Sequence, residues 1–283
     1  MIIGKKEEGI NVDNRPIGVM DSGVGGLTVL KEIVKVLPSE SYIFVGDQAN
    51  LPYGQKSPAT VRRLTKRIAD FMMRQNVKMF VIACNTSTAA SLDYLTAQLP
   101  IPVIGVITPG AESAVAATKN NQIGVIATNG TVKSGDYQRI IKGLNPHTNV
   151  YSLGCPDFVT MVEHGEAGSQ IALEKVRQQL AYFKGKPVDT LVLGCTHFPV
   201  LENEIRQAVN ANVQLIDPGI STAQNVAAYL RSHDQLRDPN VDSQIKEFYT
   251  TGNQKEFTQI ADQLLGKQIH AKHLSLGRED VIS

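Results

Sequence analysis

The chain has 283 residues, of which 42% are hydrophobic and 19% are charged, a composition typical of a globular protein with one large domain or two of ordinary size. Its 28 basic and 27 acidic residues are spread along the chain and give a net charge of +1, so no basic patch indicates a nucleic acid partner. The sequence offers neither a leader-like apolar stretch at its start nor the roughly 18 uninterrupted apolar residues of a membrane span. We therefore expect a cytoplasmic protein without a membrane partner.

Short runs rich in valine and isoleucine alternate with longer helical segments along the chain. We predict strands, in chain order, at residues 17–20, 42–46, 79–83, 103–107, 123–127, 150–154, 190–194, 213–217 and 246–250. The segments between them, such as 27–37 and 171–183, carry apolar residues at the spacing of an amphipathic helix. This alternation is typical of a doubly wound α/β fold with mostly parallel sheets. In such folds, ligands bind beyond the carboxyl ends of the strands.

Four short motifs occur twice in the same order. The pairs are IGVMDSG with IGVIATNG, YIFVGD with VYSLGCP, VIACNT with LVLGCTH, and VIGVITPG with VQLIDPG, and matched residues are 106 to 111 positions apart. This nearly constant offset predicts two similar domains related by internal duplication, with an active site in the cleft between them. We place the first domain at residues 16–107 plus 219–283 and the second at 108–218. Residues 1–15 form an N-terminal tail that we expect to be disordered.

Three cysteines, Cys84, Cys155 and Cys195, are an odd number without a Cys-x-x-Cys pair, which argues against a disulfide framework and a zinc ribbon. The histidines lack metal-ligand spacing, so we predict no metal site. Cys155 has no polar neighbour in the sequence and is interpreted as structural.

Cys84 and Cys195 each follow a predicted strand, in equivalent motifs, and are expected to reach one cleft from opposite sides. Mirrored thiols suit a racemisation, in which one group removes a proton from one face of a carbon and a second group delivers a proton to the other face. The segment after each thiol also has the composition of a helix start, and a helix N-terminus stabilises a thiolate.

Motifs at five separated places carry a resemblance to one known family. They are DSGVGGLTVL at 21–30, LPYG at 51–54, ACNTSTA at 83–89, the segment 155–163 and LGCTHFP at 193–199. In this order they resemble the glutamate racemase family, within the aspartate/glutamate racemase superfamily. The resemblance implies a two-domain α/β enzyme that needs no cofactor and interconverts L-glutamate and D-glutamate with two cysteines. It also implies a homodimer and a role in supplying D-glutamate for peptidoglycan synthesis.

The resemblance assigns roles to individual residues. Cys84 would deprotonate D-glutamate and Cys195 would deprotonate L-glutamate, and each thiol would then protonate the carbanion that the other forms. Asp21 beside the first thiol, His197 beside the second, and the acidic Glu163 would assist these proton transfers. The residues implied in substrate binding are Asp21, Ser22, Tyr53, Gly54, Asn85, Thr86, Thr196 and His197.

Three other functions fit parts of the pattern. One is a related cofactor-free carbon-acid enzyme, such as an aspartate racemase. Another is a cysteine hydrolase that uses Cys195 with His197 and needs no second thiol. The third is an amino-acid-binding module without catalysis. A nucleotide is not expected, because the glycine-rich GVGG at 23–26 lacks the spacing of a dinucleotide site.

Overall fold

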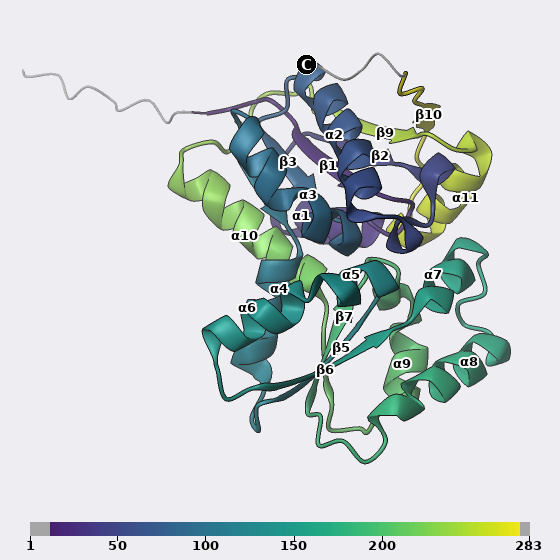
Figure 1. Ribbon diagram of the computed structural model, residues 1–283. Coiled ribbons are helices and arrows are strands. Elements are labelled where there is room, and N and C mark those ends of the chain that lie inside the picture. Colours follow the sequence, from purple (N-terminus) through teal and green to yellow (C-terminus); the bar gives the residue numbers. More distant parts are fainter. Residues whose placement is uncertain (1–11, 278–283) are drawn as a thin grey trace, which may run out of the picture.

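Ten strands form two separate parallel sheets in the computed structural model, which describes residues 12–277 (Figure 1). The first lobe, drawn uppermost in Figure 1, is built on a six-stranded sheet with the order β10-β9-β2-β1-β3-β4. The second lobe is built on a four-stranded sheet with the order β6-β5-β7-β8. Neighbouring strands are parallel in both sheets. The predicted α/β class with parallel sheets is therefore confirmed.

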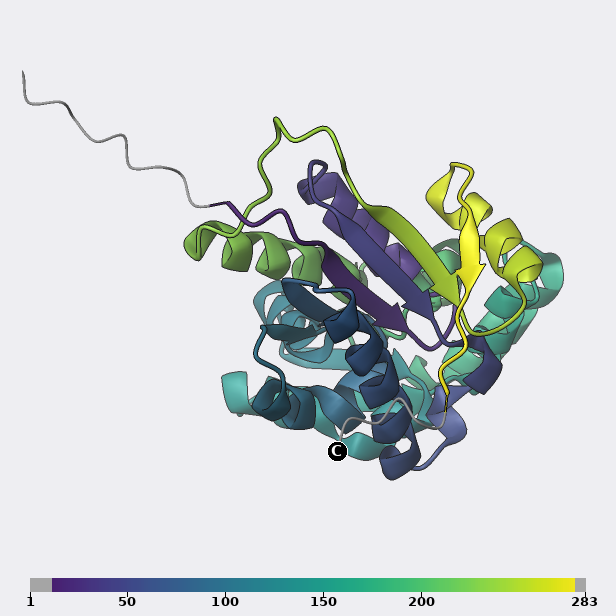
Figure 2. The same cartoon turned by 90° about the horizontal axis from the view of Figure 1, so that it is seen from above.

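The first lobe combines the N-terminal part of the chain with its C-terminal part. The N-terminal elements are β1 (Ile17–Asp21), α1 (Leu27–Val36), β2 (Tyr42–Gly46), the 3-10 helices η1 (Gln48–Asn50) and η2 (Tyr53–Gln55), α2 (Pro58–Arg74), β3 (Met79–Ile82), α3 (Asn85–Gln98) and β4 (Val103–Gly105). The C-terminal elements are α10 (Pro218–Ser232), β9 (Lys246–Thr250), α11 (Gln254–Leu265) and β10 (Ala271–His273). Figure 2 shows β9, in green, beside β2, which separates it from β1, although β9 lies far from both in the sequence.

The second lobe is formed by the middle of the chain. Its elements are α4 (Ile107–Ala117), β5 (Gln122–Ala127), α5 (Asn129–Ser134), α6 (Asp136–Leu144), β6 (Asn149–Gly154), α7 (Pro156–Glu163), α8 (Gln170–Leu180), η3 (Ala181–Phe183), β7 (Thr190–Gly194), η4 (Phe198–Leu201), α9 (Glu202–Ala208) and β8 (Gln214–Ile216). Because α4 packs against α6 and β7 while α10 packs against α1, the chain passes between the lobes just before α4 and just before α10. We retain domain boundaries near residues 107 and 218 as a proposal.

The two sheets share one strand order. Four strands of the first sheet have the order β2-β1-β3-β4, with β9 and β10 added beyond β2, and the second sheet has the order β6-β5-β7-β8. The first four strands of each lobe, counted along the chain, therefore take the same places. As a result β3, which leads to Cys84, and β7, which leads to Cys195, occupy equivalent positions. An internal duplication would produce this likeness, and the common origin of the two halves stays a prediction.

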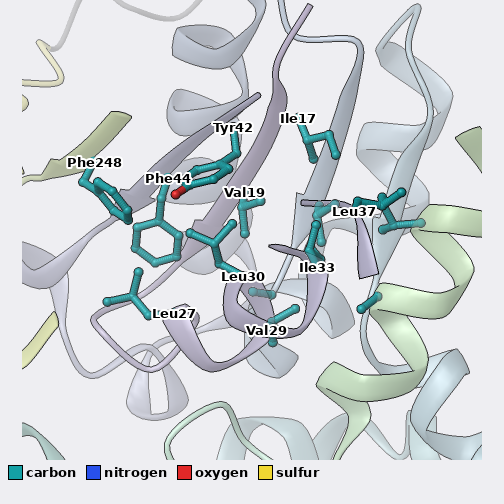
Figure 3. Packing of buried hydrophobic residues seen from close by; sticks show 14 of the residues in the cluster. Ile17, Val19, Leu27, Val29, Leu30, Ile33, Leu37, Tyr42, Phe44 and Phe248 are labelled. Carbon is teal, nitrogen blue, oxygen red and sulfur yellow. The ribbon is translucent and has the colours of Figure 1, made fainter. Parts of the chain in front are cut away.

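Alternate residues of the first sheet enter two different cores. Ile17, Val19 and Phe44 pack into a cluster with α1 and α10, whereas Met20 and Val45 pack into a cluster with α2 and α3, because successive side chains of a strand point to opposite faces. Figure 3 shows the first cluster, in which aliphatic side chains of α1 and aromatic side chains of β2 and β9 meet. Helices thus cover both faces of the sheet, which explains why its inner strands are continuous apolar runs.

Two strand predictions differ from the structure at the edges of the first sheet. The strand predicted at 103–107 ends at Gly105, because α4 already begins at Ile107. The edge strand β10, at 271–273, was not predicted. It has three residues, two of them exposed, and so lacks the apolar run that marks an inner strand.

Part of the predicted N-terminal tail is ordered. The backbone N–H of Asp13 donates to the carbonyl of Leu236, and the ammonium group of Lys78 donates to the carbonyl of Asp13. The expectation of disorder is therefore wrong for residues 12–15, which are tied to the loop after α10. Residues 1–11 of that tail lie outside the described residues. None of the helices between residues 12 and 277 combines the length and apolarity that crossing a bilayer requires.

Candidate active site

Cys84 lies between the end of β3 and the start of α3. Its Sγ accepts a hydrogen bond from the Ser87 backbone N–H at 3.4 Å, in the manner of a helix N-cap. The thiol donates to the hydroxyl oxygen of Ser22 at 3.7 Å. Burial, and then the nearby charge of Asp21, raise the pKa of the Cys84 thiol to about 12. With these neighbours Cys84 is a protonated thiol at neutral pH.

Cys195 follows β7 and begins a chain of polar contacts. Its Sγ lies 3.7 Å from His197 Nδ1, and His197 Nε2 lies 2.6 Å from Oε1 of Glu163, the last residue of α7. Burial alone lowers the pKa of His197, but the hydrogen bonds to Cys195 and Glu163 outweigh burial and hold the pKa well above its ordinary value. Burial likewise acts to raise the pKa of Glu163, and the bond from His197 reverses that effect and lowers it. This side of the site therefore holds an imidazolium between a sulfur and a carboxylate.

The local backbone differs between the two thiols. After Cys84 an α-helix begins at once, and the N–H of Thr88, four residues on, donates to the Cys84 carbonyl. The equivalent donor for Cys195 would be residue 199, but Pro199 has no N–H. Phe198 donates to the Cys195 carbonyl instead, and η4 precedes α9. The predicted helix start after Cys195 therefore takes the form of a 3-10 helix that begins at Phe198, and the positive charge beside this thiol comes from an imidazolium.

Asp21 connects the two lobes beside the thiols. Its carboxylate is fully buried, accepts a hydrogen bond from Thr196 Oγ1 of the second lobe at 3.1 Å, and accepts another from the Gly23 N–H at 3.0 Å. Burial raises the pKa of Asp21, and the positive charge of His197 opposes the rise. At Gly25 an added Cβ would stand 2.6 Å from Thr196 Oγ1 and 2.7 Å from His197 Nδ1, so only glycine permits this close approach of the lobes.

A small cavity between the lobes brings most of the predicted site residues together. Those that line it are Ser22, Tyr53, Gly54, Cys84, Asn85, Thr86, Cys195, Thr196 and His197. Asp21 and Glu163 are not among the lining residues and act on the cavity through Thr196 and His197. The cavity measures about 30 Å³, which is room for roughly two water molecules. An amino acid therefore needs the lobes to separate before it can bind.

The polar lining residues are held by fixed partners. The Tyr53 hydroxyl donates to Asp47 Oδ2 at 2.5 Å, so in this structure its proton is bonded within the first lobe and is not offered to a ligand. The Tyr137 hydroxyl donates to Asn85 Oδ1 at 2.8 Å, which leaves the amide nitrogen as the group that Asn85 can offer to a ligand. These bonds preset the direction of the donors before any ligand arrives.

Several residues of the site escaped the sequence analysis. Asp47 and Thr128 follow β2 and β5 directly, so the rule that ligands bind at strand ends would have found both. At an offset of 106 positions Thr128 also matches Ser22, which was selected. Tyr137 lies within α6 and Gln48 within η1. No local pattern marks either residue, because only the tertiary fold brings them to Asn85 and to Glu163.

Cys155 is separate from the cavity. Its side chain is fully buried in the apolar core of the second lobe, and burial raises the pKa of the thiol to about 12, in keeping with a structural thiol. Within residues 12–277, no group of three or more His, Cys, Asp or Glu side chains is arranged to hold a metal ion. The expected independence from metals and cofactors stays a prediction.

Comparison with known proteins places the chain in a family. The sequence profile described as Asp/Glu/hydantoin racemase matches residues 17–226. The chain belongs to this racemase family. Among the family's members, the glutamate racemase of Levilactobacillus brevis is 49% identical over 269 residues, which are 94% of this chain and 97% of the relative. The glutamate racemase of Enterococcus faecalis is 47% identical over 92% of this chain and 96% of its own length.

Solved structures of the same racemase family share the two-lobed fold. A glutamate racemase of Bacillus anthracis matches with a TM-score of 0.88 and 38% identity over 93% of this chain and 98% of its own. A glutamate racemase of Francisella tularensis, solved in complex with D-glutamate, matches with a TM-score of 0.87 and 37% identity over the same shares. An aspartate racemase of Picrophilus torridus, 20% identical with a TM-score of 0.55, shares the fold alone. The predicted membership among the glutamate racemases is confirmed.

Proposed function

We propose that this chain interconverts L-glutamate and D-glutamate by a two-base reaction of Cys84 and Cys195 without a cofactor. The observation that carries the proposal is that both thiols line one cavity between the lobes, each with its own polar partners. The near relatives named glutamate racemases, one of them solved with D-glutamate, support glutamate as the substrate.

The side of Cys195 is prepared to remove a proton. Because His197 is a cation in contact with both Cys195 and Glu163, its positive charge lies beside the sulfur that we assign as the base on this side. A thiolate at this position takes the α-proton of L-glutamate. The imidazolium need not lose its own proton in this step, and it stabilises the sulfur before the transfer.

The side of Cys84 is prepared to deliver a proton. Its thiol is protonated, and it lies across the cavity from Cys195. When the α-carbon becomes a carbanion, Cys84 donates its proton to the opposite face and D-glutamate forms, leaving Cys84 as the thiolate. The reverse reaction starts from that thiolate, which the N-terminus of α3 and the Ser87 N–H stabilise. The ammonium group of the bound substrate adds a positive charge that lowers the pKa of a thiol beside it.

The remaining lining residues are assigned to substrate binding. Asn85, Thr86, Ser22 and Thr196 offer amide and hydroxyl groups for the two carboxylates and the ammonium group, and Gly54 exposes its backbone. Because the cavity holds only about two water molecules, closure around the substrate excludes solvent and strengthens each of these interactions.

One arrangement also favours a second function. Cys195, His197 and Glu163 form a thiol, imidazole and carboxylate series, which is the geometry of a cysteine hydrolase. Such an enzyme uses a single thiol and has no need of Cys84. The hydrolase is therefore the alternative that experiment must distinguish.

The experiment compares Cys84→Ala and Cys195→Ala with the wild-type enzyme. Purified protein is incubated with L-glutamate or D-glutamate without added cofactor, and inversion is followed by circular dichroism. The proposal predicts inversion in both directions by the wild type and none by either variant. Inversion that persists in Cys84→Ala would refute the two-base reaction, and no inversion by the wild type would refute glutamate as the substrate. A homodimer, a cytoplasmic location and a role in supplying D-glutamate for peptidoglycan stay predictions.

A further inference from the structure

Two larger cavities adjoin the small one between the thiols. The first, here called the vestibule, measures about 560 Å³ and is bounded by the start of α2, by α3 and by α5. It shares Gly54, Gln55 and Thr86 with the small cavity. The second, here called the rear cavity, measures about 760 Å³, is bounded by α11 and the end of α7, and shares only Leu51 with the small cavity. Either one could be the route by which substrate reaches the thiols.

The vestibule is separated from the thiols by small groups of both lobes. Gly54 and Thr86 belong to the first lobe, and Thr128 and Gly130 to the second, where α5 faces α3 (Figure 1). A Cβ added at Gly130 would lie 3.1 Å from the Gly54 carbonyl oxygen and 3.2 Å from the Thr86 methyl carbon. The hydroxyl groups of Thr86 and Thr128 are 2.8 Å apart and hydrogen-bonded. The contacts that join the lobes at this place are bonds between uncharged groups, each of modest net strength.

The rear cavity is closed from the thiols by stronger contacts. There Glu163 accepts hydrogen bonds from His197 Nε2 at 2.6 Å, from Gln48 Nε2 at 3.3 Å and from the Val24 N–H at 3.3 Å. Two of these bonds join the first lobe to the second. Opening this side would take two first-lobe hydrogen-bond donors, Gln48 and Val24, away from a partly buried carboxylate, and hydrogen bonds to charged groups are stronger than those between two hydroxyl groups.

The two cavities also differ in charge. The charged side chains lining the vestibule are Lys56 from the first lobe and Lys133 from the second. Neither of them forms an ion pair within residues 12–277. The rear cavity is lined by the carboxylates of Glu163 and Glu256. Glutamate carries a net negative charge, so the two lysines at the vestibule attract it, whereas the residues lining the rear cavity include no lysine or arginine.

We propose that glutamate reaches and leaves the thiols through the vestibule, and that Lys56 and Lys133 attract its carboxylates there. The passage opens where Gly54 and Thr86 part from Thr128 and Gly130. This inference rests on the proposed racemisation of glutamate and adds the route and two residues that serve it. Neither lysine lines the cavity between the thiols, so both act on substrate capture and not on the proton transfers.

A blocking experiment tests the route. A cysteine is introduced at Ser134 in the vestibule, or at Gln259 in the rear cavity, and labelled with a bulky maleimide; mass spectrometry verifies that the buried native thiols stay unlabelled. We expect labelled Ser134→Cys to lose more than tenfold in kcat/KM while labelled Gln259→Cys keeps its activity. If the label lowered kcat/KM in Gln259→Cys and left it unchanged in Ser134→Cys, the proposed route would be wrong.

A charge experiment tests the two lysines independently of any label. We expect Lys56→Gln and Lys133→Gln each to lower kcat/KM by about threefold at low ionic strength with kcat unchanged, and the loss to vanish at high salt, where charges are screened. The matched control is Lys255→Gln, which removes the same charge from α11 near the rear cavity and is expected to leave kcat/KM unchanged or to lower it less. An equal loss in this control, or no loss in the vestibule variants, would overturn the role of the lysines. A wild-type enzyme that does not invert glutamate would instead refute the proposed function.

Discussion

The contact between Glu163 and His197 holds a positive charge beside Cys195, and the substitution Glu163→Gln removes that control with little change in shape. In the wild type, His197 Nε2 lies 2.6 Å from Glu163 Oε1, and the side chains are 1% and 13% exposed. A glutamine keeps an acceptor oxygen near this position but carries no charge. The substitution therefore lowers the pKa of His197 and weakens the positive charge beside the Cys195 sulfur.

The expected effect follows from the strength of the lost interaction. A hydrogen bond between charged groups contributes about 1.5–3 kcal/mol, which corresponds to a factor of about 10 to 150 in the rate of the step that depends on it. That step is the deprotonation of L-glutamate by Cys195. Because the two enantiomers have equal free energy, kcat/KM must fall equally in both directions, so the affected step has to be identified by isotope effects.

The assay measures kcat/KM with α-deuterated L-glutamate and α-deuterated D-glutamate. In Glu163→Gln the proton transfer at Cys195 limits the rate more strongly, so the primary isotope effect is expected to rise for the L enantiomer and to fall for the D enantiomer. The matched control is Glu166→Gln, at a partly exposed residue of the following loop that pairs with Lys175, and it is expected to change neither value. A loss of less than twofold in Glu163→Gln, or equal changes in the two isotope effects, would refute the role given to this contact.

The same contact predicts a pH dependence of folding stability. The pKa of His197 is raised in the folded state, so its contribution is present below the unfolded pKa of about 6.5 and is lost as the pH rises through the folded value. The pKa of Glu163 is lowered, so its contribution is present above about 4.3 and is lost as the pH falls through the folded value. Urea unfolding should show the largest stability difference between the wild type and Glu163→Gln between these two pH values, with a smaller difference outside them.

Three further substitutions test other parts of the structure. Lys78→Met removes a fully buried ammonium group that pairs with a carboxylate at 2.7 Å, and urea unfolding is expected to show a loss of about 3–5 kcal/mol with kcat unchanged. Gly25→Ala forces a Cβ against the second lobe at 2.6 Å and should lower kcat, whereas Gly143→Ala, in a helix with nothing within 4 Å, should leave kcat unchanged. Tyr137→Phe removes the hydrogen bond that orients the Asn85 amide. We expect KM for glutamate to rise about tenfold, which corresponds to a loss of about 1.4 kcal/mol in binding free energy. An unchanged KM would show that Asn85 is not a binding group.

The strands that carry the thiols could be predicted from the sequence because their signal is local. Buried parallel strands are short apolar runs, and a polar residue directly after such a run lies at the carboxyl edge of the sheet, as Cys84 and Cys195 do. The repeated motifs also indicated that the two edges would be equivalent. In contrast, β10 is short and half-exposed and has no such signal.

The outer contacts of the site, beyond the direct partners of the thiols, could not be predicted from local patterns. The role of Glu163 came from the family resemblance, and its contact with Gln48 arises only because the two lobes meet. Tyr137 reaches Asn85 from the first turn of α6. The helix after Cys195 begins as the 3-10 helix η4 and not as an α-helix, because Pro199 lacks the N–H that the Cys195 carbonyl would accept, and a comparison of residue types between the two halves does not reveal this backbone effect.

The measurement that tests the two-base reaction most directly follows the α-hydrogen in deuterium oxide. Wild-type enzyme is incubated with unlabelled L-glutamate, and samples taken before a tenth of the substrate has reacted are analysed for deuterium in each enantiomer. The account predicts that D-glutamate carries solvent deuterium from its first appearance while the remaining L-glutamate keeps its protium. Unlabelled D-glutamate, or early exchange of the remaining L-glutamate without inversion, would contradict it.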